Sequence, residues 1–228
     1  MPKVVMLVDA PTELATAATD GLLALESLGL AAWLSRAPMG GAWRSRLWRG
    51  AFALLAVASL LGAATHGLAL PTGFQALVWP VLYLALGVMV ALFLVGAVLD
   101  GWGPVSARRL LPWALAGGAA CVAATGLLGG AFRVFLVFEG GAMLAALAVY
   151  VRLAARQRLP GAGLITLSIL VNLVAAGIQA GGVSPRALLP LDHNGLFHLV
   201  QMTGVALLAA GLTRNKASPA ATSSTTPA

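Results

Sequence analysis

The chain has 228 residues, of which 60% are hydrophobic and only 9% are charged, and its formal net charge at pH 7 is +7. A chain this apolar does not fold as a water-soluble domain, so the composition indicates an all-α integral membrane protein. The basic residues lie between hydrophobic runs, where they orient helices in a bilayer, and this pattern argues against nucleic-acid binding.

Seven stretches are long and apolar enough to cross about 30 Å of hydrocarbon as helices, which takes about 20 residues each. We expect residues 1–12 to form an extracytoplasmic N-terminal segment. Residues 214–228 should form a disordered cytoplasmic tail, because after Lys216 only Ala, Ser, Thr and Pro occur. The seven-helix transmembrane domain covers 13–213, with spans at 13–34, 48–69, 75–99, 109–129, 132–154, 161–182 and 193–213.

The basic residues gather on one side of this predicted bundle. The opposite side has only Lys3, Arg133 and Arg186. Because cytoplasmic loops of membrane proteins are enriched in Lys and Arg, the pattern predicts a multi-pass protein of the cell membrane with its N-terminus outside and its C-terminus in the cytoplasm. The cytoplasmic group is Arg36, Arg44, Arg46, Arg49, Arg108, Arg109, Arg152, Arg156, Arg158, Arg214 and Lys216.

Polar side chains inside the predicted spans concentrate in the outer half of the membrane. An ionisable residue at this depth costs about 2.5 to 3.5 kcal/mol on insertion scales and indicates a functional site. In the first span, Glu13 and Asp20 are seven residues apart and therefore share one stripe of the helix. Ser59 and His66 share a face of the second span in the same way, and Glu139 lies in the outer third of the fifth.

The three histidines of the chain, His66, His193 and His198, all fall in this outer layer. Zinc favours imidazole and carboxylate ligands, and catalytic zinc sites usually combine three protein ligands with a water molecule. We therefore expect the three histidines to bind zinc and Asp20 and Asp192 to be the catalytic carboxylates. Asp20 could act as a fourth ligand, as a hydrogen-bonding partner of a ligand or as a general base.

Two segments resemble the CREST superfamily of seven-helix membrane proteins, which includes alkaline ceramidases, adiponectin-type progestin receptors and hemolysin III relatives. A histidine closes the second span in Gly62-Ala63-Ala64-Thr65-His66, and Asp192-His193-Asn194-Gly195-Leu196-Phe197-His198 opens the seventh. The resemblance implies that His66, His193 and His198 bind zinc and that the zinc activates water to hydrolyse lipid amides.

The chain also departs from the superfamily pattern. The superfamily spaces its last two histidines four residues apart, whereas here the position four before His198 is Asn194. Because five residues on a regular helix separate side chains by about 140°, His193 can join His198 only at the helix N-terminus, where Asp192 or Asn194 could be the cap. Gly62 replaces a serine of the pattern, and Asp20 is the candidate substitute for its third-span aspartate.

Three functions are compatible with the sequence. The first is a zinc-dependent hydrolase of membrane lipid amides or esters with its site in the outer half of the bundle. The second is a non-enzymatic seven-helix receptor or scaffold, whose polar residues only hold the bundle together. The third is a haem-binding membrane protein, because two histidines from different helices can ligate one iron.

The assignment of His193 as a ligand gives a first prediction. We expect His193→Ala to weaken zinc retention by the purified protein, and Asn194→Ala to weaken it less, because only imidazole is a common zinc ligand. Elemental analysis of the two variants measures this, and the reverse order would identify Asn194 as the better candidate.

Overall fold

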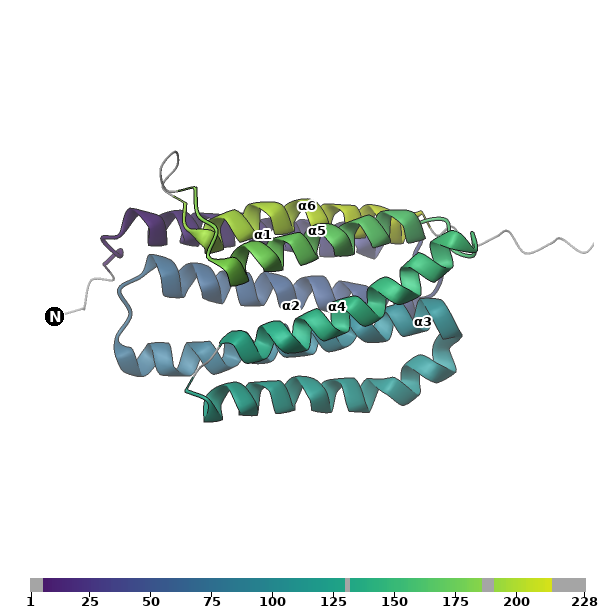
Figure 1. Cartoon of the computed structure of the whole chain (residues 1–228), viewed down its shortest axis with the longest axis horizontal. Helices are drawn as coiled ribbons and strands as arrows, with labels where there is room; N and C mark the ends of the chain where they lie inside the picture. Colours follow the sequence, from purple (N-terminus) through teal and green to yellow (C-terminus); the bar gives the residue numbers. More distant parts are fainter. Residues whose placement is uncertain (1–5, 130–131, 186–190, 215–228) are drawn as a thin grey trace, which may run out of the picture.

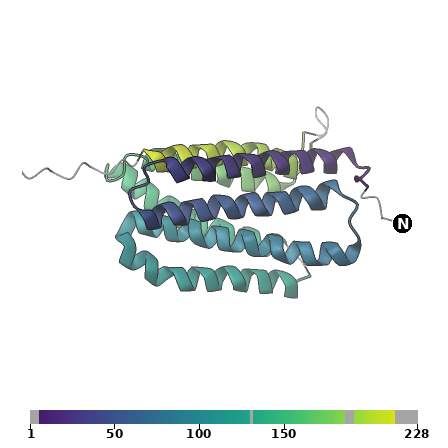
Figure 2. The same ribbon diagram turned by 180° about the vertical axis from the view of Figure 1, so that it is seen from behind.

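The computed structural model describes residues 6–129, 132–185 and 191–214. Within these residues the protein is all-α, as predicted, and an isolated bridge between Leu7 and Leu68 is its only β-pairing. The helices lie side by side along the long axis of the molecule (Figure 1 and Figure 2). They are α1 (Pro11–Arg36), α2 (Ala42–Gly67), α3 (Thr72–Leu127), α4 (Phe132–Ala155), α5 (Ala162–Gly181) and α6 (His193–Thr213).

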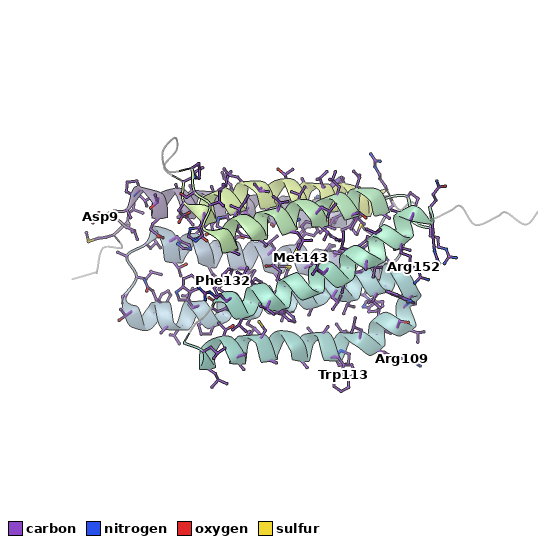
Figure 3. All side chains as sticks on the ribbon, in the orientation of Figure 1. Asp9, Arg109, Trp113, Phe132, Met143 and Arg152 are labelled. Atoms are coloured by element: carbon purple, nitrogen blue, oxygen red, sulfur yellow. The ribbon has the colours of Figure 1, made fainter. Side chains whose placement is uncertain are left out.

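All six described helices are long and apolar enough to cross a membrane. Even α5, with 20 residues, rises about 30 Å, which matches the thickness of the hydrocarbon layer. Large apolar side chains, among them Leu25, Leu77 and Trp113, are exposed on the outside of the bundle. Figure 3 shows Trp113 pointing away from the helices. The expected disordered tail, apart from Arg214, lies outside the described residues.

The predicted spans 75–99 and 109–129 both lie in α3, on either side of a kink. This helix has 56 residues, and its helical geometry breaks at Gly103, where φ is 82° and ψ is −179°. Glycine tolerates this positive φ, and Pro104 can start the following helical segment because a first-turn residue needs no N–H bond. The chain reverses at this point, and the two parts of α3 run back alongside each other (Figure 2).

The close contact between the two parts of α3 depends on small residues. A Cβ atom built on Gly87 would lie 3.0 Å from the carbonyl oxygen of Gly118, and one built on Gly118 would lie 2.7 Å from that of Gly87. Small residues allow helix backbones to approach this closely in membrane bundles. The sequence run around Gly117 and Gly118 therefore serves helix packing, as its composition suggests.

The helices form a closed ring. Each packs against its neighbours in chain order, and α1 packs against α6. We call the end where α1 and α6 begin the histidine end, and the opposite end the arginine end. Figure 3 shows Asp9 at the first and Arg109 and Arg152 at the second.

A buried ion pair fastens the helices at the arginine end. The Nε and Nη2 atoms of Arg44 donate to the two carboxylate oxygens of Asp100 at 2.6 and 2.9 Å, and the Tyr150 hydroxyl donates to Asp100 at 2.9 Å. The Arg44 guanidinium also donates to the carbonyl oxygens of Met39 and Leu212. Because these partners come from α2, α3, α4 and α6, one cluster ties most of the ring together.

This cluster predicts a large effect of one substitution on stability. Arg44→Met should lower the free energy of unfolding by about 3–5 kcal/mol, because it leaves the Asp100 carboxylate buried without its cation. Thermal unfolding in a non-ionic detergent measures the loss. The matched control is Arg46→Met, since Arg46 is exposed two residues away. Equal losses in the two variants would show that the ion pair does not hold the bundle.

Candidate functional site

A cavity of about 310 Å³ opens within the ring at the histidine end. Residues from all six helices line it, and the predicted ligands His66, His193 and His198 are among them together with Asp20. The ring closure between α1 and α6 brings Asp20 and His198 together, although they are far apart in the sequence. The structure therefore gathers four of the five predicted site residues around one space.

The hydrogen bonds of His198 define which ring nitrogen carries a proton. The hydroxyl of Thr19 donates to the carbonyl oxygen of Thr16 at 2.9 Å, so its single hydrogen is used. The Nδ1 atom of His198 lies 3.0 Å from this same hydroxyl oxygen and must be the donor in that bond. In a neutral ring, Nε2 then has a free lone pair.

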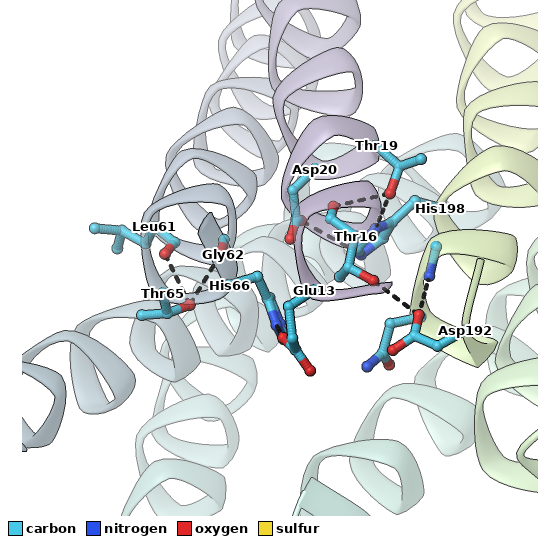
Figure 4. Close-up of polar contacts among 12 residues, drawn as sticks. Glu13, Thr16, Thr19, Asp20, Leu61, Gly62, Thr65, His66, Asp192 and His198 are labelled. Atoms are coloured by element: carbon cyan, nitrogen blue, oxygen red, sulfur yellow. Dashed lines mark hydrogen bonds and ion pairs between the residues drawn. The ribbon is translucent and has the colours of Figure 1, made fainter. Parts of the chain in front are cut away.

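That Nε2 atom faces a carboxylate. It lies 3.3 Å from Oδ1 of Asp20, and both side chains are buried (Figure 4). The lone pair of Nε2 and the lone pairs of Oδ1 repel each other unless a proton or a metal cation lies between the two atoms. Two ligands of a tetrahedral zinc ion, at about 2.0 to 2.1 Å from the metal, are about 3.3 Å apart. The pair therefore has the spacing of two ligands of one ion.

Gly62 makes room for the Asp20 carboxylate. A Cβ atom at Gly62 would lie 2.7 Å from Oδ2 and 2.8 Å from Oδ1 of Asp20, so a side chain here would force the carboxylate to move. The carboxylate of α1 thus occupies the space that a side chain on α2 would fill. This contact gives a physical reason for glycine at a position where the resembled pattern has serine.

His66 is oriented by a different carboxylate. Its Nδ1 atom lies 2.7 Å from Oε2 of Glu13, and because a carboxylate only accepts, Nδ1 is the donor. This leaves Nε2 of the neutral ring free, as in histidine ligands that a carboxylate orients. The ring also packs edge-on against Trp79, with centroids 6.2 Å apart.

Asp192 has a different position from the other predicted residues. It is the N-cap of α6, where one carboxylate oxygen accepts from the Gly195 N–H at 2.8 Å and from the Thr16 hydroxyl at 2.7 Å. It does not line the cavity. Burial raises the pKa of this carboxyl, but the hydrogen bonds from Gly195 and Thr16 outweigh burial, so the pKa lies below its ordinary value of 3.8. Asp192 thus fixes the start of the helix that carries His193 and His198.

The side chains are not assembled into a complete metal site. No group of three or more His, Cys, Asp and Glu side chains is placed to hold an ion, as far as the described part of the chain extends. Asp20 and His198 have ligand spacing, whereas binding of an ion would require His66 or His193 to turn toward them. His193 lines the cavity from the first residue of α6.

Several residues in or beside the cavity are not identified as site residues by the sequence alone. Thr16 and Thr19 share the buried stripe of α1 with Asp20, and this spacing was the available signal. The aromatic wall of the cavity had no such signal, because Trp79 resembles an interfacial anchor and phenylalanines also face lipid. Its rings follow one another at centroid distances of 5.5 to 6.2 Å and belong to Trp79, Tyr83, Phe132 and Phe135.

Comparison with known proteins gives one match. Residues 15–217 match the model of a family described as a family of unknown function (DUF6962). No curated protein matches the chain, and no solved structure matches it.

The cap geometry predicts a pH-dependent contribution to stability. Because the pKa of Asp192 is lowered in the folded protein, its ionised form stabilises the fold above the unfolded pKa of 3.8, and this stabilisation disappears as the pH falls through the folded pKa. The free energy of unfolding of the wild type should therefore exceed that of Asp192→Asn by about 1 kcal/mol near pH 6, and this difference should be smaller at about pH 3. Thermal unfolding at the two pH values measures the gap, and a gap independent of pH would contradict this role for the charge.

Proposed function

We propose that this chain, which belongs to the family of unknown function DUF6962, is a multi-pass membrane hydrolase that uses zinc to cleave lipid amides or esters at its histidine end. The observation that carries the proposal is the buried pair of His198 Nε2 and Asp20 Oδ1, 3.3 Å apart in a cavity that two further histidines line. A buried imidazole nitrogen that faces a carboxylate oxygen at this distance requires a proton or a metal cation between them, and a zinc ion meets this requirement.

The proposed orientation places the histidine end outside the cell. The reversal at Gly103 lets α3 cross the membrane twice, which gives seven crossings in all. Ten described arginines lie at the arginine end and one, Arg133, lies at the other, and this supports a cytoplasmic arginine end and an outer N-terminus. The ten are Arg36, Arg44, Arg46, Arg49, Arg108, Arg109, Arg152, Arg156, Arg158 and Arg214.

The residues around the cavity fit a zinc ion chemically. Asp20 and His198 have the spacing of two ligands, and His66 and His193 complete the set in the proposed site. The Nδ1–H groups of His66 and His198 are bonded to Glu13 and Thr19, so both rings keep Nε2 for the ion. Zinc bound there would polarise the scissile carbonyl and lower the pKa of a water molecule.

Side chains of the protein would transfer the protons and bind the apolar part of the substrate. One oxygen of Asp20 faces His198, and the other can accept a proton from the attacking water and return it to the leaving amine or alcohol. The aromatic wall beside His66 provides an apolar surface for the hydrocarbon part of a lipid and keeps bulk water away. Water is added across the amide or ester bond, which yields an acid and an amine or alcohol.

Metal content tests the proposal directly. Protein purified in detergent should contain near-stoichiometric zinc, which should fall at least about tenfold in His198→Ala and His66→Ala and more modestly in the control Ser59→Ala, since Ser59 lines the same cavity without a ligand role. Hydrolysis of fluorescent ceramide and ester probes should fall in parallel. Absence of zinc together with a Soret band would identify a haem protein, and absence of both would support a receptor or scaffold.

A further inference from the structure

One carboxylate of the cavity has no role in the proposed chemistry. Glu139, on α4, lines the cavity, yet it forms no hydrogen bond or ion pair with any described residue. The nearby basic residue in the sequence, Arg133, is exposed and does not pair with it. A carboxylate inside a helical bundle is costly and generally has a partner.

The side chains around Glu139 indicate which kind of ligand could pair with its carboxylate. Phe132, Phe135 and Glu139 follow one another at helical spacing on α4, and all three line the cavity. On the facing helix, Tyr83 continues this aromatic wall, with its ring centroid 6.2 Å from that of Phe132. Aromatic rings beside a carboxylate are the surroundings that bind amines and quaternary ammonium groups, through charge pairing and cation–π contact.

The charged residues that line the cavity also favour a cationic ligand. None of the described residues that line it is Lys or Arg, whereas Asp20 and Glu139 both supply carboxylates. Asp20 is directed at His198, so Glu139 is the carboxylate left for a ligand. Such a lining disfavours anionic ligands such as a free fatty acid or a phosphate near Glu139 and favours a cation.

We propose that the cavity binds a ligand that carries an amine or quaternary ammonium group, held by Glu139 and the aromatic wall of Tyr83, Phe132 and Phe135. Amine binding itself does not depend on the hydrolase reaction. The further step, that the substrate or its product is such an amine-bearing lipid, rests on the proposed function. In that case the cation would lie against α4, while the bond to be cleaved would lie against Asp20 and His198 on the other side of the cavity.

A matched ligand pair tests amine binding. Phenylbutylamine and phenylbutanol have the same carbon skeleton, but only the amine is positively charged at pH 7. Titration calorimetry on the full-length protein in a non-ionic detergent should show tighter binding of the amine. Glu139→Gln should weaken amine binding at least about tenfold and leave alcohol binding unchanged, because the lost contact is a charge-assisted hydrogen bond.

The control variant is Glu26→Gln, which makes the same chemical change in α1 at a carboxylate that does not line the cavity, and should leave both affinities unchanged. Unchanged alcohol binding in Glu139→Gln also shows that the cavity is intact. If wild type binds the alcohol as tightly as the amine, or Glu139→Gln keeps the preference, the proposal is wrong. The variant His66→Ala/His198→Ala separates the two proposals, since it should lose zinc but keep the preference for the amine.

Discussion

The bundle depends on one constraint, which is that a polar group inside an apolar helical ring has no water to pair with and needs a partner within the protein. The cluster around Arg44 and Asp100 at the arginine end meets this constraint. Arg44 donates to both oxygens of Asp100, Tyr150 donates to the same carboxylate, and the backbone carbonyls of Met39 and Leu212 accept from Nη1 of Arg44. Each partner lies on a different part of the ring, so meeting the constraint also fixes how the helices are placed.

The histidine end shows the opposite situation. Thr19 and Glu13 satisfy the Nδ1 atoms of His198 and His66, but Nε2 of His198 faces an oxygen of Asp20 and needs a proton or a cation between them, and Glu139 has no partner among the described residues. The contrast between the two ends is physically informative, because a protein that keeps incompletely paired charges in an apolar setting loses stability by doing so. Such groups persist where a ligand or ion supplies the missing charge, and this supports the proposal of a binding site at the histidine end.

The helices were largely readable from the sequence, because about 20 apolar residues in a row have few alternatives to a membrane-crossing helix. Predicted spans 132–154 and 193–213 nearly coincide with α4 and α6. Spans 75–99 and 109–129 both lie in α3, on either side of the kink at Gly103. The faces of the helices were less readable. Lipid and helix contacts are both apolar, so periodicity did not show that Trp79 and Phe135 line the cavity while Trp113 faces outward.

By itself, the sequence determined that the protein is a bundle of apolar helices with its histidines at one end and most of its arginines at the other, because helix length, residue depth and charge distribution are properties of the linear chain. Only the tertiary structure decided which polar groups meet. The contact between α1 and α6 brings Asp20 to His198, the absence of a side chain at Gly62 leaves space for that carboxylate, and the rotation of α4 turns Glu139 toward the cavity. These pairings depend on the rotation and separation of whole helices, which close packing between distant segments sets.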